Sequence, residues 1–527
     1  MTVGAACQPL AHADGRVPTP VRSLGATRLA ADVAVVAAAA ALLALSGTQG
    51  GPWWAAVAAG GLLWPRLVRA RGWHAASLAA MALLPVPAIG YEGLRIYDPP
   101  AWWAVSAAVA VGYGAAGALA AGLAASLRPA APPAWRPLAC LAAWSALDLL
   151  VSHAQPWPLP VPVTVGYALV GGPFVALAAL AGPTGLGIAW GVLGVACAGL
   201  GRGSFGLPGA RAWWPAAAAV ALVAVGVQVA AGAVAMGPSR AVAVLQVPDD
   251  GAPGLDRLSA FAAGAAALRA DLHVWPEAAL ARELADDASP LHAVALDLDA
   301  AVVAGAFRRT HDGAWRNAVA LADRHGALFA VDKRRLVPGY EDWLTPGIGE
   351  RWPLRAAGWR LGVLICWESL FLDEAIDRVR RGADVLLVLA HDGWANGTGT
   401  PWWHARAGRL VAWSVGRPVV VASHDGPSMA WGFDGRALAE TGPGAGALLA
   451  EVAAPVRWRT PYVWLGPRGL AAIWGAAVAA WIVASRRAAR APPKPAARAP
   501  PKPAARAPPR PAARPSQGCG ASGPQAA

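Results

Sequence analysis

Residues 361–368 read Leu-Gly-Val-Leu-Ile-Cys-Trp-Glu. The first five residues carry no charged or polar side chain, which predicts a β-strand covered on both faces by other layers of the protein. Cys366 follows directly where this strand ends. Because α/β sheets present reactive groups beyond the ends of their strands, the stretch predicts a layered α/β domain with Cys366 at the functional edge.

Short apolar runs of the same kind recur between Arg240 and Arg457. The predicted strands lie at residues 241–247, 272–275, 302–307, 318–322, 328–331, 361–365, 385–390 and 418–422. Helical stretches are predicted between several of them, at residues 255–270, 372–381 and 403–415. Strands and helices therefore share this region, as expected of an α/β domain.

The rest of the 527-residue chain is strongly apolar. The whole sequence is 56% hydrophobic and 14% charged, about half the charged share of roughly 25% that is usual in soluble domains. Apolar runs comparable to the roughly 17 to 25 residues of a membrane span occur at residues 29–46, 52–65, 73–90, 101–127, 138–151, 176–200, 213–236 and 463–484. The second and fifth runs are short. The sequence predicts a multi-pass α-helical membrane bundle joined to the α/β domain.

Arginines in the connecting loops predict the orientation. Ten arginines before residue 240 fall in one set of alternate loops, and only Arg95 falls in the other set. Because basic residues mark the cytoplasmic side, the amino terminus is predicted to be cytoplasmic. Seven crossings then place the α/β domain on the extracytoplasmic, periplasmic face, and an eighth returns the carboxyl terminus to the cytoplasm.

The sequence thus divides into five predicted segments. They are a cytoplasmic leader (1–28), a seven-helix transmembrane bundle (29–239), an extracytoplasmic α/β domain (240–457), an eighth transmembrane helix (458–485) and a disordered, basic, Pro/Ala-rich cytoplasmic tail (486–527). The tail repeats the octad Ala-Ala-Arg-Ala-Pro-Pro-Lys-Pro from Ala488 and from Ala496, and its prolines exclude a helix. The net charge is +13, but residues 240–457 hold 22 basic and 26 acidic residues. The excess therefore indicates membrane topology and not a nucleic-acid partner.

Cys366 is the only one of the five cysteines inside the α/β domain. Cys7 lies in the leader, Cys140 and Cys197 lie in predicted helices, and Cys519 lies in the tail. This distribution gives neither a disulfide framework nor a zinc site, and no cofactor or metal is predicted. A buried structural thiol is the alternative for Cys366.

A nucleophilic cysteine needs a base and a group that stabilises the oxyanion formed on attack. Glu277 follows the strand at 272–275, and Lys333 follows the strand at 328–331. Each residue alone fits a solvated surface group equally well. Together with Cys366 at a third strand end, they predict one active site.

The motifs around these residues resemble the nitrilase superfamily of carbon-nitrogen hydrolases, with its Glu-Lys-Cys triad. The matching motifs are Trp275-Pro276-Glu277, Lys333-Arg334-Arg335-Leu336-Val337-Pro338 with Glu341, and Cys366-Trp367-Glu368. With seven helices before the domain and one after it, residues 29–484 resemble the apolipoprotein N-acyltransferase family. The resemblance implies an αββα sandwich for the domain and a monomeric, multi-pass protein of the bacterial inner membrane.

The resemblance also implies a ping-pong acyl transfer, the last step of lipoprotein maturation. Glu277 would take the proton of Cys366, and the thiolate would attack an ester of a membrane phospholipid to form a thioester. Lys333 would stabilise the oxyanion. The α-amino group of the diacylglyceryl-cysteine of an apolipoprotein would then accept the acyl chain.

Three further residues are assigned supporting roles by the resemblance: Glu341 would assist near Lys333, and Trp367 and Glu368 would support the nucleophile. The chain departs from the family pattern at residues that surround the triad, namely His391, Ala395, Val411, Ser414 and His424. Whether they change the acceptor is left open. The alternatives are a membrane-tethered amidase, an acyltransferase with another amine acceptor, and an inactive lipoprotein-binding scaffold.

Overall fold

The computed structural model describes residues 23–47, 51–70, 72–126, 135–153, 164–201, 207, 209–246, 254–280, 286–349 and 351–490. Most of the predicted leader and the tail beyond residue 490 lie outside the described residues. The chain up to Ala477 forms one compact unit, and the residues from Val478 onward form a second. The bundle and the α/β domain both belong to the first unit.

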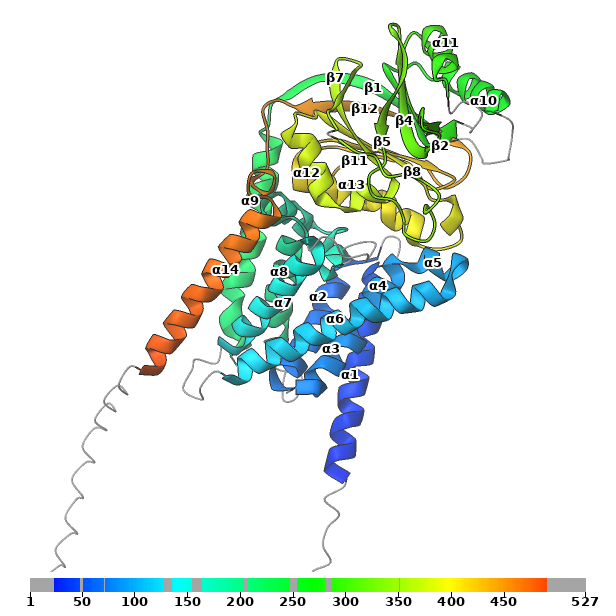
Figure 1. Ribbon diagram of the computed structural model, residues 1–527. Coiled ribbons are helices and arrows are strands. Elements are labelled where there is room, and N and C mark those ends of the chain that lie inside the picture. The colour runs from blue at the N-terminus through cyan, green and yellow to red at the C-terminus, as the bar shows by residue number, and fades with distance from the viewer. Residues whose placement is uncertain are drawn as a thin grey trace, which may run out of the picture. The chain divides into compact units, whose positions relative to one another are not determined.

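The predicted apolar runs before the domain all coincide with helices (Figure 1). The helices are α1 (Ser23–Gly47), α2 (Trp53–Arg69), α3 (Gly72–Leu83), α4 (Pro85–Gly90), α5 (Glu92–Tyr97), α6 (Pro99–Ser126), α7 (Trp135–His153), α8 (Ala178–Ala198) and α9 (Trp214–Gly232). Short 3-10 turns stand before the last two, namely η1 (Val165–Leu169), η2 (Pro173–Leu177) and η4 (Ala210–Trp213).

Six helical segments among the described residues are long and apolar enough to cross a membrane. They are Leu29–Gly47, Gly72–Gly90, Pro99–Gly122, Pro173–Ala198, Ala210–Gly232 and Pro461–Ala480. The two runs predicted to be short correspond to α2, which has 17 residues, and to α7, whose apolar part is Pro137–Ala146. The multi-pass helical character predicted from hydropathy is therefore confirmed.

Small residues let the bundle helices approach one another closely. A Cβ atom added to Gly60 of α2 would lie 3.1 Å from the Cα atom of Gly194 on α8. The Trp190 indole on α8 donates a hydrogen bond to the Ala56 carbonyl at 2.8 Å. Close backbone approach and polar anchoring of this kind are how helices associate in lipid, where the hydrophobic effect does not drive them together.

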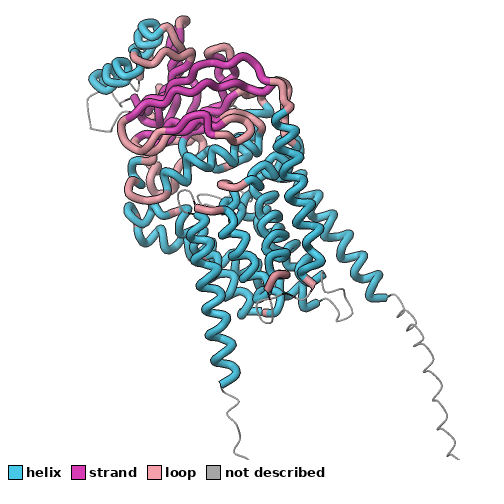
Figure 2. Tube along the Cα trace, turned by 180° about the vertical axis from the view of Figure 1, so that it is seen from behind, coloured by secondary structure: helices cyan, strands magenta, loops and turns pink. Residues whose placement is uncertain are grey.

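The domain contains two six-stranded sheets (Figure 2). The first has the order β12-β1-β2-β3-β4-β5, and the second has the order β11-β10-β9-β8-β7-β6. The strands are β1 (Met236–Gln246), β2 (Leu272–Leu280), β3 (Ala301–Arg309), β4 (Trp315–Asp323), β5 (Gly326–Asp332), β6 (Leu354–Ala356), β7 (Trp359–Ile365), β8 (Val385–His391), β9 (Val419–His424), β10 (Met429–Trp431), β11 (Ala437–Glu440) and β12 (Gly446–Pro455). Strands β1, β2 and β3 are parallel, as are β7, β8 and β9.

Alternate residues of these strands face two different apolar layers. On β7, Leu361, Val363 and Ile365 point into the layer between the two sheets, whereas Leu364 packs against helices. Helices α10 (Gly254–Ala266) and α11 (Ser289–Leu298) cover the outer face of the first sheet, and α12 (Leu372–Arg380) and α13 (Thr400–Val415) cover that of the second. The domain is thus an αββα sandwich, which explains why its central strands are apolar at nearly every position.

Helix α11 and the four strands β6, β10, β11 and β12 are missing from the sequence-based prediction. Strand β12 reads Gly-Ala-Leu-Leu-Ala-Glu-Val-Ala-Ala-Pro, and its alanines and glycine favour no strand. It nevertheless pairs with β1 along most of its length, so tertiary pairing overrides its weak propensity. The last helix, α14 (Pro461–Arg490), is kinked at Gly466, whose φ of +62° is left-handed.

Hydrogen bonds join the bundle to the domain. The Glu92 carboxylate of α5 accepts from the Gly399 backbone N–H at 2.9 Å, and the Gly93 backbone N–H donates to Thr400 at 2.7 Å. Both bonds reach the start of α13, the helix that lies under the second sheet. The bundle therefore helps to fix the helix that supports the candidate site.

Candidate active site

Cys366 lies at the turn between strand β7 and the short 3-10 helix η6 (Cys366–Leu370). Its φ is +53°, in the left-handed region that non-glycine residues rarely adopt. Such a conformation costs on the order of 1–3 kcal/mol and persists only where the surroundings hold it. The turn lifts the partly buried thiol beyond the end of the strand, where the sequence predicted it.

Glu368 supplies much of that support, although its side chain is fully buried. Its carboxylate accepts hydrogen bonds from the backbone N–H groups of Ile365 and Arg334, at 2.9 and 2.7 Å. The Arg351 guanidinium donates two more, at 2.6 and 2.8 Å. Burial raises the pKa of Glu368, but the hydrogen bonds and charge of Arg351 outweigh burial and lower the pKa to about 2. One carboxylate thus ties the Cys366 turn to the segment that follows Lys333.

Glu277 projects from an irregular part of strand β2. The pairing of β2 with β3 shifts register between Trp275 and Leu280, and Ala278 has a φ of +55°. Gly305 on β3 leaves room for this bulge, because a Cβ there would collide with the Pro276 carbonyl and with Glu277. Bulges of this kind re-aim side chains next to active sites.

Lys333 holds two carboxylates together in a buried cluster. Its Nζ atom lies 2.8 Å from Glu277 Oε1 and 2.9 Å from Glu341 Oε1. Burial alone would lower the pKa of Lys333, but the charges of Glu277, Cys366 and Glu341 raise it above its ordinary value. The lysine therefore stays a cation in a site from which water is largely excluded.

Asn317 is a member of this cluster that the sequence-based prediction did not include. Its Nδ2 donates to Glu277 Oε1 at 2.6 Å and to Glu341 Oε1 at 3.0 Å. It is 2% exposed and lies on β4, just before a buried apolar run. A lone amide at the start of such a run was the available signal, because a buried polar side chain needs partners.

The electrostatic surroundings keep the resting thiol protonated. Burial is the largest cause, and it raises the pKa of Cys366 well above the ordinary value, with Glu277 and Asp392 adding to the rise. Lys333 and a hydrogen bond from the His391 backbone N–H act in the opposite direction without outweighing it. A thiol in this environment needs a base beside it before it can act as a nucleophile.

A second buried network reaches the backbone of Cys366 from helix α13. His404 Nδ1 lies 2.8 Å from Asp392 Oδ1, and its Nε2 lies 3.0 Å from the Ser369 hydroxyl. Ser369 in turn donates to the Cys366 carbonyl at 2.9 Å. Burial lowers the pKa of His404, but the charge and hydrogen bond of Asp392 outweigh it and raise the pKa overall.

Trp367 packs beside the nucleophile and does not point at the buried carboxylates. Its indole N–H donates to the Arg335 carbonyl, and its ring meets Phe371 edge-on at 5.3 Å between centroids. The Arg335 guanidinium lies 4.3 Å from the centre of the same Phe371 ring. Trp367 therefore provides a second link, besides Glu368, between the Cys366 turn and the segment after Lys333.

The five departures from the family pattern lie in three places. Val411 and Ser414 are buried residues of α13, and the Ser414 carbonyl accepts a hydrogen bond from Thr460 at 2.6 Å. His391 and His424 lie next to each other, with ring centroids 4.9 Å apart. Ala395 is buried near Gly93 of α5. Of these five residues, only the histidine pair lies beside the Cys366 thiol, to which the His391 backbone N–H donates.

No group of three or more His, Cys, Asp or Glu side chains is placed to hold a metal ion within the ranges that the structure describes. The acidic side chains nearest Cys366 are occupied by Lys333, Asn317, Arg351 and His404. The arrangement places a thiol near a buried carboxylate and a buried ammonium group.

A family comparison covers this region of the chain. Residues 233–459 match the model of the carbon-nitrogen hydrolase family. Over this stretch the chain is similar to carbon-nitrogen hydrolases. Its first and last matched residues lie close to the start of β1 and the end of β12, so the family match coincides with the αββα sandwich.

Curated relatives of the chain are apolipoprotein N-acyltransferases. The protein of that name from Sinorhizobium medicae is 32% identical over 232 residues, which is 36% of this chain and 44% of the relative. The one from Vibrio cholerae is 26% identical over 244 residues, covering 39% of this chain and 48% of the relative. The chain therefore spans less than half the length of these relatives. The resemblance that the sequence motifs predicted, to carbon-nitrogen hydrolases and to apolipoprotein N-acyltransferases, is confirmed.

Solved structures of carbon-nitrogen hydrolases are more distant. That of the Helicobacter pylori enzyme is 18% identical, with a TM-score of 0.36, and the match covers 41% of this chain and 89% of that one. The amidase from Nesterenkonia is 22% identical with a TM-score of 0.35, and the match covers 46% of this chain and 99% of that one.

Proposed function

We propose that this protein transfers a fatty acyl chain from a membrane phospholipid to the amino-terminal cysteine of apolipoproteins. The observation that carries the proposal is the position of Cys366 beside the buried Glu277–Lys333–Glu341 cluster, in a chain with helices that can span a membrane. The names of the curated relatives support the same activity.

In the first half-reaction, the Glu277 carboxylate takes the proton from the Cys366 thiol. The sulfur attacks the ester carbonyl carbon of the phospholipid, the bond from that carbon to the glycerol oxygen breaks, and Glu277 returns the proton to this oxygen. The products are a thioester on Cys366 and a lysophospholipid. Lys333 stabilises the oxyanion, since a fixed cation in a dry site acts strongly on developing negative charge.

In the second half-reaction, the free α-amino group of a diacylglyceryl-cysteine attacks the thioester carbonyl. The carbon–sulfur bond breaks, Glu277 accepts a proton from the amine and passes it to the leaving sulfur, and an amide is formed. In this scheme the same carboxylate acts first as base and then as acid in each half-reaction. Water must be kept from the thioester, and the burial of the cluster supports that requirement.

The remaining site residues hold Cys366, Glu277 and Lys333 in position. Asn317 donates to both Glu277 and Glu341. Glu368 accepts from the backbone at the strained Cys366 turn, and Trp367 donates to the Arg335 carbonyl. These contacts support a positioning role for each of the predicted supporting residues.

The topology and the segment boundaries belong to the same proposal. Six candidate spans and the curated relatives support a multi-pass protein of a bacterial inner membrane. We place the domain on the periplasmic face with both termini in the cytoplasm, because the loop arginines favour this orientation.

Mass spectrometry of lipoprotein amino termini tests the proposal directly. The gene is expressed in a bacterium depleted of its own N-acyltransferase, and we expect triacylated termini to reappear. The purified protein, mixed with phospholipid alone, should also yield a hydroxylamine-sensitive acyl group on the Cys366 peptide. Termini that stay diacylated, with no acyl group on Cys366, would count against the proposal.

A further inference from the structure

A cavity of about 310 Å³ lies where helix α13 of the domain meets the ends of the bundle helices. Its lining includes none of Cys366, Glu277 and Lys333. Helix α13 contributes to both places, because its His404 joins the network under Cys366 while other α13 residues line the cavity. The cavity is therefore a site separate from the candidate active site.

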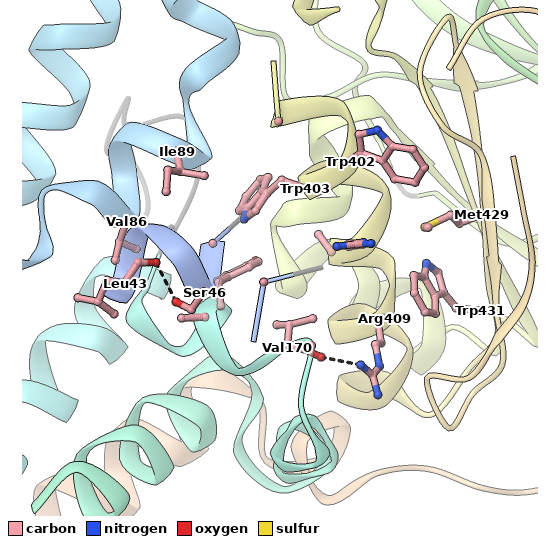
Figure 3. Close-up of a pocket in the computed structure, with 18 of the residues that line it drawn as sticks. Leu43, Ser46, Val86, Ile89, Val170, Trp402, Trp403, Arg409, Met429 and Trp431 are labelled. Carbon is pink, nitrogen blue, oxygen red and sulfur yellow. Dashed lines mark hydrogen bonds between the residues drawn. The ribbon is translucent and has the colours of Figure 1, made fainter. Parts of the chain in front are cut away.

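The two walls of the cavity differ in chemistry (Figure 3). The bundle wall is aliphatic and includes Leu43 of α1 with Val86 and Ile89 of α4. The facing wall on α13 presents the indole rings of Trp402 and Trp403. Tryptophan is enriched where lipid chains give way to head groups, so this pairing of walls is typical of a membrane interface.

Two arginines of α13 add cationic donors to the aromatic wall. Arg409 Nη1 donates to the Val170 carbonyl at 2.9 Å, while its Nε has no acceptor among the residues that the structure describes. The Arg406 guanidinium lies 5.8 Å from the centre of the Trp402 ring, and within the described ranges it forms no ion pair with a carboxylate. Glu440 is the one carboxylate among the lining residues of this cavity. The wall thus keeps guanidinium donors available to an anionic ligand.

We propose that this cavity binds the phosphate head group of an anionic membrane phospholipid, with the start of its acyl chain against α1 and α4. Guanidinium groups recognise phosphate through charge-assisted hydrogen bonds, and the aliphatic wall suits the chain. The volume is at the lower end of the roughly 300–1,000 Å³ that is usual for ligand sites, so it accommodates the head group and not a whole lipid. The proposal depends on membrane insertion and not on the acyl transfer proposed above.

Native mass spectrometry of the full-length protein tests this site. The protein is reconstituted in nanodiscs of phosphatidylcholine with phosphatidylglycerol, transferred to mild detergent, and the retained phosphatidylglycerol is counted. We expect about tenfold weaker retention for Arg406→Gln, the loss expected when one charge-assisted hydrogen-bonding group is removed. Ala407→Leu, which fills the cavity without changing its charge, should have a similar effect.

Two variants serve as controls. Arg309→Gln removes a half-exposed arginine on β3 that is paired with Asp286, and it should retain the lipid as the unchanged protein does. Cys366→Ala should also retain it, because the cavity does not include the thiol. Circular dichroism and elution volume establish that each variant is folded.

Several outcomes would overturn the proposal. Equal retention by the unchanged protein, Arg406→Gln and Ala407→Leu would remove the site. Loss of the lipid in Cys366→Ala would show that the retained molecule occupies the active site. Displacement by inorganic phosphate alone would point to a free-anion site, and displacement by a diacylated lipopeptide alone would point to an acceptor site.

Discussion

The Cys366 thiol combines a strained backbone with surroundings that keep it protonated. In the proposed mechanism, the neighbouring Glu277 and Lys333, which form an ion pair, supply the base and the cation that such a thiol lacks by itself. The chemistry proposed for this protein therefore depends on one sulfur atom. The other described cysteines, Cys140 and Cys197, lie in bundle helices α7 and α8.

We expect Cys366→Ala to lower acyl transfer at least about a thousandfold, as loss of a covalent nucleophile does in other enzymes. Cys140→Ala and Cys197→Ala should change activity less than about twofold, because both thiols lie in bundle helices, α7 and α8. Labelling with a thiol-reactive lipid analogue, followed by transfer assays on all three variants, checks this. Labelling that survives in Cys366→Ala would remove the nucleophile assignment.

Glu368 gives a prediction for stability. In Glu368→Gln the buried Arg351 loses its counter-charge, and an uncompensated buried ion costs about 3–5 kcal/mol. We expect the free energy of unfolding in detergent to fall by roughly that amount. Replacing both residues, in Arg351→Met with Glu368→Gln, should recover part of the loss, and a double variant no more stable than the single one would contradict this account.

The lowered pKa of the Glu368 carboxylate predicts how the free energy of unfolding depends on pH. Its pKa in the folded protein is about 2, below its ordinary value of 4.5, so its contribution is complete above pH 4.5 and is lost as the pH falls toward 2. The shift corresponds to about 3 kcal/mol. Acid titrations of the unfolding temperature should therefore be steeper between pH 4.5 and 2 in the unchanged protein than in the double variant.

At the scale of elements, the site depends on places where two strands depart from regular geometry. Strand β2 bulges at Glu277 because Gly305 on β3 has no side chain. Strand β7 ends in the left-handed turn at Cys366. One irregularity orients Glu277 and the other orients Cys366. Small changes in strand packing should therefore affect activity strongly.

We expect Gly305→Ala to displace Glu277 and reduce acyl transfer by about a hundredfold, since a shift of about 1 Å in a reacting group can cost that much. Its matched control is Gly442→Ala, where no atom lies within 4 Å of the added Cβ. Steady-state assays of the two variants check this, with circular dichroism as the measure of folding. Equal activity in both variants would show that the bulge does not position Glu277.

The sequence predicts the strands and the candidate site residues whose positions follow from the local pattern of apolar residues. Apolar strands without alternation indicated covered sheets, and residues at three strand ends indicated the site. Asn317 was not included, because its role comes from two carboxylates distant in sequence, and a lone amide before an apolar run does not identify its partners. The Asp392–His404–Ser369 network was missed for the same reason, and β12 was missed because β1 imposes its conformation.

At the scale of the whole molecule, the distribution of charge and the hydropathy both divide the chain into apolar helical segments and a more polar α/β domain. The apolar runs carry few charges, and the region 240–457 is slightly acidic. Positive charge concentrates in one set of loops and in the tail. Under the positive-inside rule, this distribution favours the periplasmic orientation of the domain that we propose.

Native cysteines allow this topology to be tested in the full chain. In a Cys366→Ala background, Arg436→Cys introduces a thiol at a side chain that is 82% exposed in the domain. A membrane-impermeant maleimide applied to intact spheroplasts should label this introduced thiol. It should reach the native Cys7 and Cys519 in the leader and tail only after lysis. Labelling of Cys7 or Cys519 before lysis, with the introduced thiol protected, would show that the topology is the reverse of the proposed one. The proposed chemistry would then lie in the wrong compartment for secreted lipoproteins.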